Sequence, residues 1–165
     1  MKICEVNMLE NINPLFKAQI NHWRKAIKPG IIEALEAVPD EKLDWAPSQG
    51  MIPLGMIFLH MAETSDWWYD DIMKGQPATE LAFLDKECPP KDKIAEHLEE
   101  HWNRLERFFS EDEEALKNIY ERESESWKIS KTGYWIFMHL FEHDIHHRSQ
   151  IHHYLRILGI KPPKI

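Results

Sequence analysis

Hydrophobic residues recur every three or four positions in four segments of this chain, with polar residues between them. That spacing places the apolar side chains on one face of a helix, so the pattern predicts four helices. Their expected limits are about 14–38, 53–74, 91–120 and 130–159, the third with a charged extension beyond Phe109. No alternating pattern of useful length predicts a β-strand.

Proline and glycine mark the ends of these segments. Asn13 can cap the first helix, and Pro14 suits its first position because an amide there would have no partner within the helix. Pro39 ends that helix, and Pro29 should kink or split it, since proline removes one internal hydrogen bond. A glycine follows the second helix and another follows the fourth, as is typical of helix ends.

The connection between the second and third helices, residues 75–90, is longer than an antiparallel turn requires. A helix of about 22 residues is about 33 Å long, and an extended connection of this length can span that distance. The chain can therefore cross back and run the third helix parallel to the second. The sequence predicts a single domain over residues 1–165, all-α, folded as a four-helix bundle, and the length of this connection permits an up-down-down-up order.

Six of the ten histidines lie in residues 139–159, and they are not equivalent. With about 100° per residue and His139 at zero, the apolar residues of this helix fall at about 60–120°. His143 and His147 fall at about 40° and 80°, at the buried side and one turn apart. Imidazoles with this spacing on a helix can converge on a divalent cation. We expect a surface position with ordinary titration for the remaining polar histidines of this segment, His146, His152 and His153.

Two other helices carry histidines on or near their apolar faces. His60 lies near the centre of the inward face of the second helix, where a lone histidine is more often a core residue than a ligand. Opposite an inward His143 and His147, it becomes the expected third ligand. His97 and His101 repeat the four-residue spacing but lie on the flank of the apolar stripe of the third helix. We expect those two at the surface or in a groove.

Other chemistries account less well for the same residues. A zincin protease requires HExxH, and here Asp144 occupies the glutamate position, about 100° away from the histidine pair. A di-iron bundle requires glutamate three residues before a histidine, which occurs nowhere in this chain. Haem ligation by His60 with His143 or His147 stays open, as does a pH switch built on clustered histidines.

Composition narrows the class of protein. The formal net charge is −8, and no cluster of lysine and arginine offers the basic surface that nucleic-acid binding requires. No apolar run approaches the about 20 residues of a membrane helix. Cys4 and Cys88 lie far apart and form no CxxC motif, so we expect two free thiols in a reducing compartment. These features predict a cytoplasmic protein that binds neither nucleic acid nor membrane.

Two stretches, "LGMIFLHMAE" around His60 and "HDIHHRSQ" around His147, carry a family resemblance. They resemble the DinB-like superfamily of small helical bundles, including its bacillithiol-transferase and YfiT-like metal-dependent hydrolase branches, and the similarity covers nearly the whole chain. In that family a histidine of the second helix and an HxxxH pair of the fourth bind a divalent metal, which implies His60, His143 and His147 here. Ser149 stands where the family usually has glycine.

The resemblance implies a metal-dependent enzyme for small molecules, often a homodimer, that uses a low-molecular-weight thiol. Trp135 and Ile157 are candidates for contact with a partner subunit or with the first helix. Three neutral imidazoles suit zinc or nickel, with iron, cobalt or manganese also open. A cation there would activate a thiol for transfer or a water for hydrolysis. We expect a bacillithiol-type S-transferase; the alternative is a non-catalytic, stress-related metal-binding protein.

Residues near the expected ligands offer few further catalytic groups. Glu63 and Gln150 each lie one turn from a ligand, and either one can act as an outer partner or as a solvated surface group. Asp71 shares a helix face with His60 but lies about 16 Å along the helix, too far to share a cation. Trp67 and Trp68 can line a substrate pocket, although core packing is the favoured interpretation.

Overall fold

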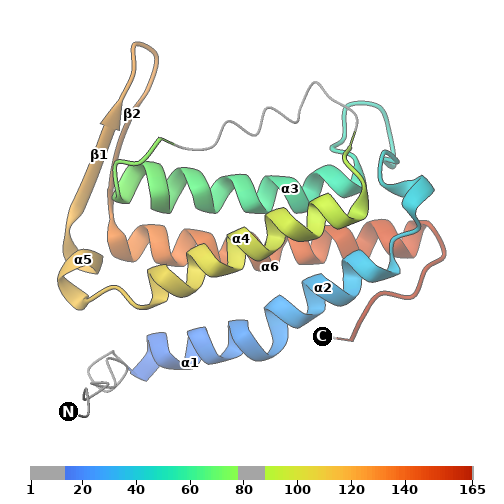
Figure 1. Cartoon of the computed structure of the whole chain (residues 1–165), viewed down its shortest axis with the longest axis horizontal. Coiled ribbons are helices and arrows are strands. Elements are labelled where there is room, and N and C mark those ends of the chain that lie inside the picture. The colour runs from blue at the N-terminus through green and yellow to red at the C-terminus, as the bar shows by residue number, and fades with distance from the viewer. Residues whose placement is uncertain (1–13, 78–87, 165) are drawn as a thin grey trace.

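The computed structural model describes residues 14–77 and 88–164, and these residues are mostly helical (Figure 1). Asn13 and Cys4, which figured in the sequence predictions, lie outside the described residues. In chain order the elements are α1 (Pro14–His22), η2 (Trp23–Ile27), α2 (Lys28–Ala37), η3 (Asp40–Lys42), α3 (Leu54–Ser65), η4 (Asp66–Met73), α4 (Lys91–Phe109), α5 (Glu113–Lys117), β1 (Ile119–Glu123), β2 (Lys128–Thr132) and α6 (Gly133–Ile157).

The first helical segment passes Pro29 without breaking. A π-helical stretch, η2, lies immediately before α2, and the amide of Lys28 donates to the carbonyl of Trp23. Hydrogen bonds that span five residues widen the helix at this point, so the chain continues past a residue that has no amide proton. The kink or split expected at Pro29 therefore takes the form of a π-turn.

The core lies where the apolar faces of the long helices meet. α3 contacts both α4 and α6, and α2 contacts α6. The apolar stripes predicted from the sequence are buried, and each fully buried large side chain contributes about 1.5–3 kcal/mol. Side chains that are at most 1 % exposed come from every long helical segment, among them Trp23, Ile27, Ile31, Phe58, Met61, Leu98, Leu105, Ile136 and Ile151.

A β-hairpin lies at residues 119–132, mostly where the sequence predicted the connection between the third and fourth helices. α4 ends at Phe109, and β1 pairs antiparallel with β2 from Ile119 opposite Thr132 to Glu123 opposite Lys128. Every residue of the two strands is exposed or partly exposed, so no buried face produces an alternating pattern in the sequence. The prediction of no strand was wrong here, and the described chain is mostly rather than entirely helical.

The last helix begins directly after the hairpin. The side chain of Thr132 accepts from the amide of Trp135, which caps α6. Gly133 packs against α5 so closely that an added Cβ would lie 2.4 Å from the carbonyl oxygen of Ala115. At the other end Gly159 adopts a positive φ of 76°, as predicted for the residue that ends this helix. None of the helices in the described ranges has the length and apolarity needed to cross a membrane.

Candidate metal centre

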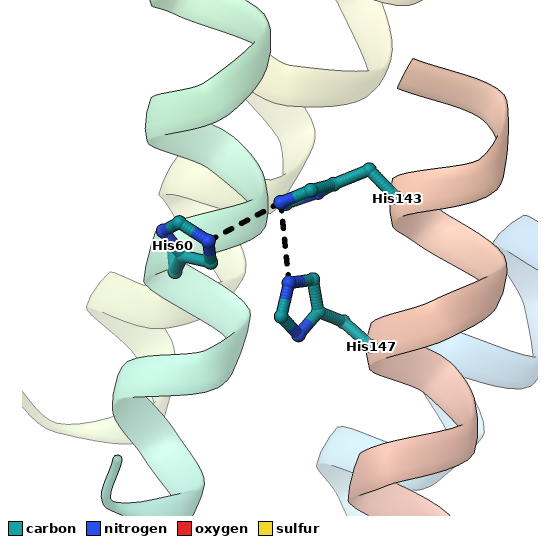
Figure 2. Close-up of side chains that lie close together, drawn as sticks. All are labelled: His60, His143 and His147. Atoms are coloured by element: carbon teal, nitrogen blue, oxygen red, sulfur yellow. Dashed lines mark hydrogen bonds between the residues drawn. The ribbon is translucent and has the colours of Figure 1, made fainter. Parts of the chain in front are cut away.

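Three histidines lie close together where α3 and α6 face each other. His60 comes from the middle of α3, and His143 and His147 come from successive turns of α6. Figure 2 shows the three rings pointing toward one another from the facing helices. His147 is buried, whereas His60 and His143 are partly exposed, so the cluster is reached from solvent on the His60 side. The three residues that the sequence predicted as ligands are therefore brought together.

The spacing of the ring nitrogens matches the spacing of ligands around one small cation. Nε2 of His143 lies 3.2 Å from Nε2 of His60 and 3.1 Å from Nε2 of His147. One ligand atom from each histidine can be chosen so that all lie within 4.8 Å of one another. Tetrahedral zinc, with Zn–N distances of about 2.0–2.1 Å, holds its nitrogens about 3.3 Å apart. The donor set fits a divalent cation without rearrangement of the helices.

The three imidazoles are neutral at physiological pH, as metal ligands must be. Burial lowers the pKa of His143, and together with the neighbouring His147 and His60 it brings this pKa to about 2. Burial also lowers the pKa of His147 to about 4, and it lowers the pKa of His60. Low dielectric surroundings disfavour the imidazolium form in each ring. The cluster therefore presents nitrogen lone pairs and carries no positive charge of its own.

Gln150 determines which nitrogen of His147 faces the cluster. Nδ1 of His147 donates to Oε1 of Gln150 at 2.8 Å, so the ring proton lies on Nδ1 and the Nε2 lone pair points inward. Thr64 lies 3.2 Å from Nε2 of His143, but its hydroxyl proton goes to the carbonyl of His60. A single proton on His143 Nε2 can serve only one of these three neighbours. A bound cation would satisfy the converging lone pairs together.

Glu63 lies beside the exposed edge of His60. Its carboxylate oxygen Oε2 is 3.9 Å from His60 Nδ1, beyond hydrogen-bond distance. Burial raises the pKa of Glu63, and the nearby Asp66 raises it further. Asp71, in contrast, forms an ion pair with Arg122 of the hairpin and takes no part in the cluster. Of these two carboxylates, Glu63 alone is placed as an outer partner of a ligand.

A second buried polar cluster lies behind the histidine triad, and it corrects the expectation for His101. His101 is 1 % exposed. Its Nε2 is 3.1 Å from Oδ1 of Asp144, which is 0 % exposed, and its Nδ1 is 2.8 Å from Oγ of Ser65. Trp23 donates to the other oxygen of Asp144 at 2.7 Å. His101 is thus a core residue that bonds to α3 and α6, and it is not a surface residue.

The cluster extends through Arg104 to the acidic end of η4. Arg104 donates to Oγ of Ser65 at 3.1 Å and to Oδ2 of Asp70 at 2.6 Å, and it lies 3.7 Å from Oδ1 of Asp66. A buried guanidinium with this many acceptors is well compensated. The sequence offered one signal for this cluster: on the α4 wheel His101 falls about 20° from Ile94, within the buried side.

The remaining histidines of α6 divide differently from the prediction. His146 and His153 are exposed as expected. His152 is only 1 % exposed, so its expected surface position was wrong; it packs toward the interior, and neither ring nitrogen meets a partner among the described residues. Burial lowers the pKa of His152. His139 stacks on Trp135 with ring centroids 4.8 Å apart and also approaches the ring of His143.

Cys88 is a free thiol, as predicted. Its sulfur packs against the first turn of α3, where a Cβ added to Gly55 would lie 2.3 Å from it. Burial, together with the nearby Asp44, raises the pKa of Cys88 to about 11. The thiol is therefore protonated at neutral pH and unreactive. It does not supply a nucleophile to the histidine cluster.

The chain is similar to known proteins in both sequence and fold. A sequence model of the DinB family matches residues 8–165. The chain belongs to the DinB family. A solved DinB-like protein from Bacillus cereus ATCC 10987 is 20 % identical and superimposes with a TM-score of 0.69, covering 90 % of this chain and 96 % of that one. The DinB-like protein YjoA from Bacillus subtilis is 19 % identical with a TM-score of 0.63, covering 89 % and 96 %.

These similarities establish a DinB-like fold over most of the chain. Among curated proteins none matches. At this level of identity the solved DinB-like structures show the fold alone. The chemistry of this DinB-family chain therefore depends on its own histidines and their surroundings.

Proposed function

We propose that this chain is a divalent-metal-dependent enzyme in which His60, His143 and His147 hold the cation, with zinc or nickel as the first candidates. The observation that carries the proposal is the convergence of three Nε2 atoms, 3.1 and 3.2 Å apart, from two separate helices. All three rings have lowered pKa values, so they are ready ligands at neutral pH. Three protein nitrogens leave at least one position of the cation open.

The reaction that suits this site best is transfer of a low-molecular-weight thiol, of the bacillithiol type, to a small electrophilic substrate. When bound, a divalent cation supplies a Lewis acid that lowers the pKa of a thiol or water beside it. Gln150 keeps the His147 lone pair directed at the site, and Glu63 lies on the exposed side where it can take up a proton. Cys88 is half-buried and its raised pKa keeps it protonated at neutral pH, so the thiol comes from a cosubstrate.

The assembly around the site is part of the same proposal. In Figure 1 the colour gradient runs one way along α1–α2 and α6 and the opposite way along α3 and α4, which supports an up-down-down-up order. A homodimer is supported by exposed apolar residues on α6, of which Ile157 is 62 % exposed. Light scattering of the purified protein tests the dimer. A small-molecule substrate fits a site whose His60 side chain is 41 % exposed. The cytoplasmic location stays a prediction.

The test combines metal analysis with a thiol assay. Freshly purified protein should contain about one equivalent of a divalent metal, and His143→Ala and His147→Ala should lose it. His153→Ala, at an exposed position on the same helix, is the matched control and should keep it. Metal-loaded protein should then consume thiol in the presence of electrophiles, and the two ligand variants should not.

Each outcome has a defined reading. Hydrolysis without thiol would replace the transferase by a hydrolase. A full site with no turnover on any electrophile or ester would favour the non-catalytic metal-binding protein. Equal metal content in the wild type and the ligand variants would contradict the metal site itself.

A further inference from the structure

Two rows of side chains lead away from the histidine triad along facing helices. On α3 and η4 the row is His60, Thr64 and Trp68, at four-residue steps. On α6 the row is His147, His143, His139 and Trp135, at the same steps in the opposite direction along the chain. Because four residues make slightly more than one helical turn, each row follows one side of its helix and turns gradually around it.

The rows touch each other at every step. Thr64 Oγ1 lies 3.2 Å from His143 Nε2 at the triad. One turn further, the ring of Trp68 lies 5.3 Å from that of His139 and 5.0 Å from that of Trp135. His139 stacks on Trp135 with an interplanar angle of 12°. The metal ligands are thus continuous with a set of aromatic rings.

The hairpin extends this set. Trp127, in the turn between β1 and β2, meets Trp67 with ring centroids 6.0 Å apart, and Trp67 meets Trp68 at 4.7 Å. An ion pair between Arg122 of β1 and Asp71 of η4 fastens the hairpin at this place. We call Trp67, Trp68, Trp127, Trp135 and His139 the aromatic wall.

The exposure of the aromatic wall calls for an explanation. It contains four of the seven tryptophans of the chain, and Trp127 and Trp135 are 43 % and 38 % exposed. By comparison, Trp23 is 0 % and Trp102 is 4 % exposed. A protein rarely leaves such apolar area in contact with water unless something binds there. Trp68, which contacts both His139 and Trp135, is 6 % exposed, and Trp67 and His139 are partly exposed.

We propose that the aromatic wall is a substrate subsite that binds an uncharged aryl group, while the reacting carbon of the same molecule lies at the histidine triad. This inference rests on the proposed metal-dependent function and names its substrate class. Trp135 lies eight residues before His143, about 12 Å along the helix. The subsite therefore suits an electrophile whose aryl group is joined to the reacting carbon by a chain of a few atoms.

Ring geometry and charge both favour an uncharged aryl group. Neighbouring rings of the wall meet at 58–74°, apart from the stacked His139 and Trp135, and a further ring can join them in the same edge-to-face manner. The cations of the hairpin are already engaged: Arg122 pairs with Asp71, Lys128 with Glu123, and Lys131 lies 4.3 Å over the Trp135 ring. Carboxylates thus neutralise Arg122 and Lys128, and the charge of Lys131 is directed at the Trp135 ring.

Two hydroxamic acids test the subsite on zinc-loaded protein. Both 3-phenylpropanohydroxamic acid and 3-cyclohexylpropanohydroxamic acid bind zinc through the same group, so calorimetry isolates the effect of the ring. The phenyl compound should bind about two- to tenfold more tightly. Trp127→Ala and Trp135→Leu should remove this preference, and Trp127→Tyr should retain it. Ile119→Ala, an exposed apolar residue of the same hairpin outside the wall, should leave it unchanged.

A second measurement needs no metal. Benzyl alcohol titrated into metal-free protein should shift the indole N–H resonances of the wall tryptophans in NMR spectra and leave those of Trp23 and Trp102 in place. Circular dichroism confirms that each variant is folded before its result is read. Because this measurement omits the cation, it separates failure of the subsite from failure of the metal site.

The outcomes are distinct. Equal binding of both hydroxamic acids, together with unshifted wall resonances, overturns the subsite and leaves the metal site standing. Shifted wall resonances without any hydroxamate binding support the subsite and contradict the metal-dependent function. If Trp127→Ala converts a dimer into a monomer in light scattering, the wall is a contact between two copies of the chain, and the proposal is overturned.

Discussion

His143 and His147 on α6 and His97 and His101 on α4 are both pairs of histidines one turn apart on a long helix, yet they meet different partners. The α6 pair faces a third imidazole, His60, across the interface with α3. In the α4 pair the residues diverge: His101 enters the core and contacts Asp144, while His97 lies near Glu100 at the flank. The residues on the facing helix, rather than the spacing, decide which pair can bind a cation.

The largest effect on stability is expected at His101. His101→Ala removes one partner of the buried Asp144 carboxylate, which keeps only the indole of Trp23. Removing a hydrogen-bond partner from a buried carboxylate costs about 1.5–3 kcal/mol, because the carboxylate loses part of what compensates for its burial. Denaturant unfolding should show a loss of this size. A loss below about 1 kcal/mol would contradict the structural role assigned to His101.

His143→Ala should have the opposite profile. Its main effect should be on metal affinity, which we expect to fall by about a hundredfold or more, because one of three protein ligands is lost. In the metal-free protein its effect on the free energy of unfolding should be far smaller than that of His101→Ala. Competition with a chromophoric chelator measures the affinity. Equal effects of the two variants on stability would remove the distinction between ligand and core histidine.

Gln150→Ala tests whether Gln150 orients the ring of His147. Without the acceptor on Nδ1, His147 is free to place its proton on Nε2, where it opposes a cation. Outer partners of this kind are worth about 10- to 100-fold in metal affinity. Gln150→Glu keeps an acceptor and should retain most of the affinity. If both variants bind metal like the wild type, Gln150 has no orienting role.

The pH dependence of metal-free stability reports on the triad. His60, His143 and His147 have folded pKa values below the unfolded value of about 6.5. As the pH falls below about 6.5, the unfolded chain takes up protons that the folded chain refuses, so the folded state loses stability. The loss is at most about 1.4 kcal/mol per pH unit for each such proton. In denaturant unfolding, the free energy of unfolding of His143→Ala should fall less between pH 7 and pH 4.5 than that of the wild type.

The smallest effect is expected at His97. His97→Ala removes an imidazole that lies 3.6 Å from Oε2 of Glu100, a carboxylate with 66 % side-chain exposure. Exposed pairs of this type contribute little to stability. The variant should match the wild type in metal content and within about 0.5 kcal/mol in unfolding. A loss of metal in His97→Ala would make the α4 pair a ligand set and reverse the comparison.

The helical faces and the triad were accessible from the sequence because both depend on one number, the rotation per residue of a helix. The same arithmetic places Asp144 at about 140° on the α6 wheel, near the buried side, and His101 near Ile94 on α4. Those two were missed because a charged or polar side chain was assumed to lie outside. Only the pairing of an acid with an imidazole from another helix makes their burial favourable.

The hairpin was not accessible in this way. Its strands "IYERE" and "KISKT" are largely exposed, and hydrophobic periodicity exists only where one face of an element is buried. Its place is determined by Arg122 with Asp71 and Trp127 with Trp67, which are contacts between residues more than fifty positions apart. Such long-range contacts leave no local pattern. The aromatic wall therefore emerged only from the three-dimensional arrangement.

His143 and Asp144 are adjacent in the chain and point to different sides of α6, one into the triad and the other into the core. A shift of α6 by a single residue, about 1.5 Å and 100°, would bring Asp144 to the place of His143. The carboxylate would then face His60, and Ile145 would stand opposite Trp23 and His101 in place of the acid. His143 and Asp144 together therefore fix the register of α6. The triad has its observed spacing only when the core contacts of Asp144 are also formed.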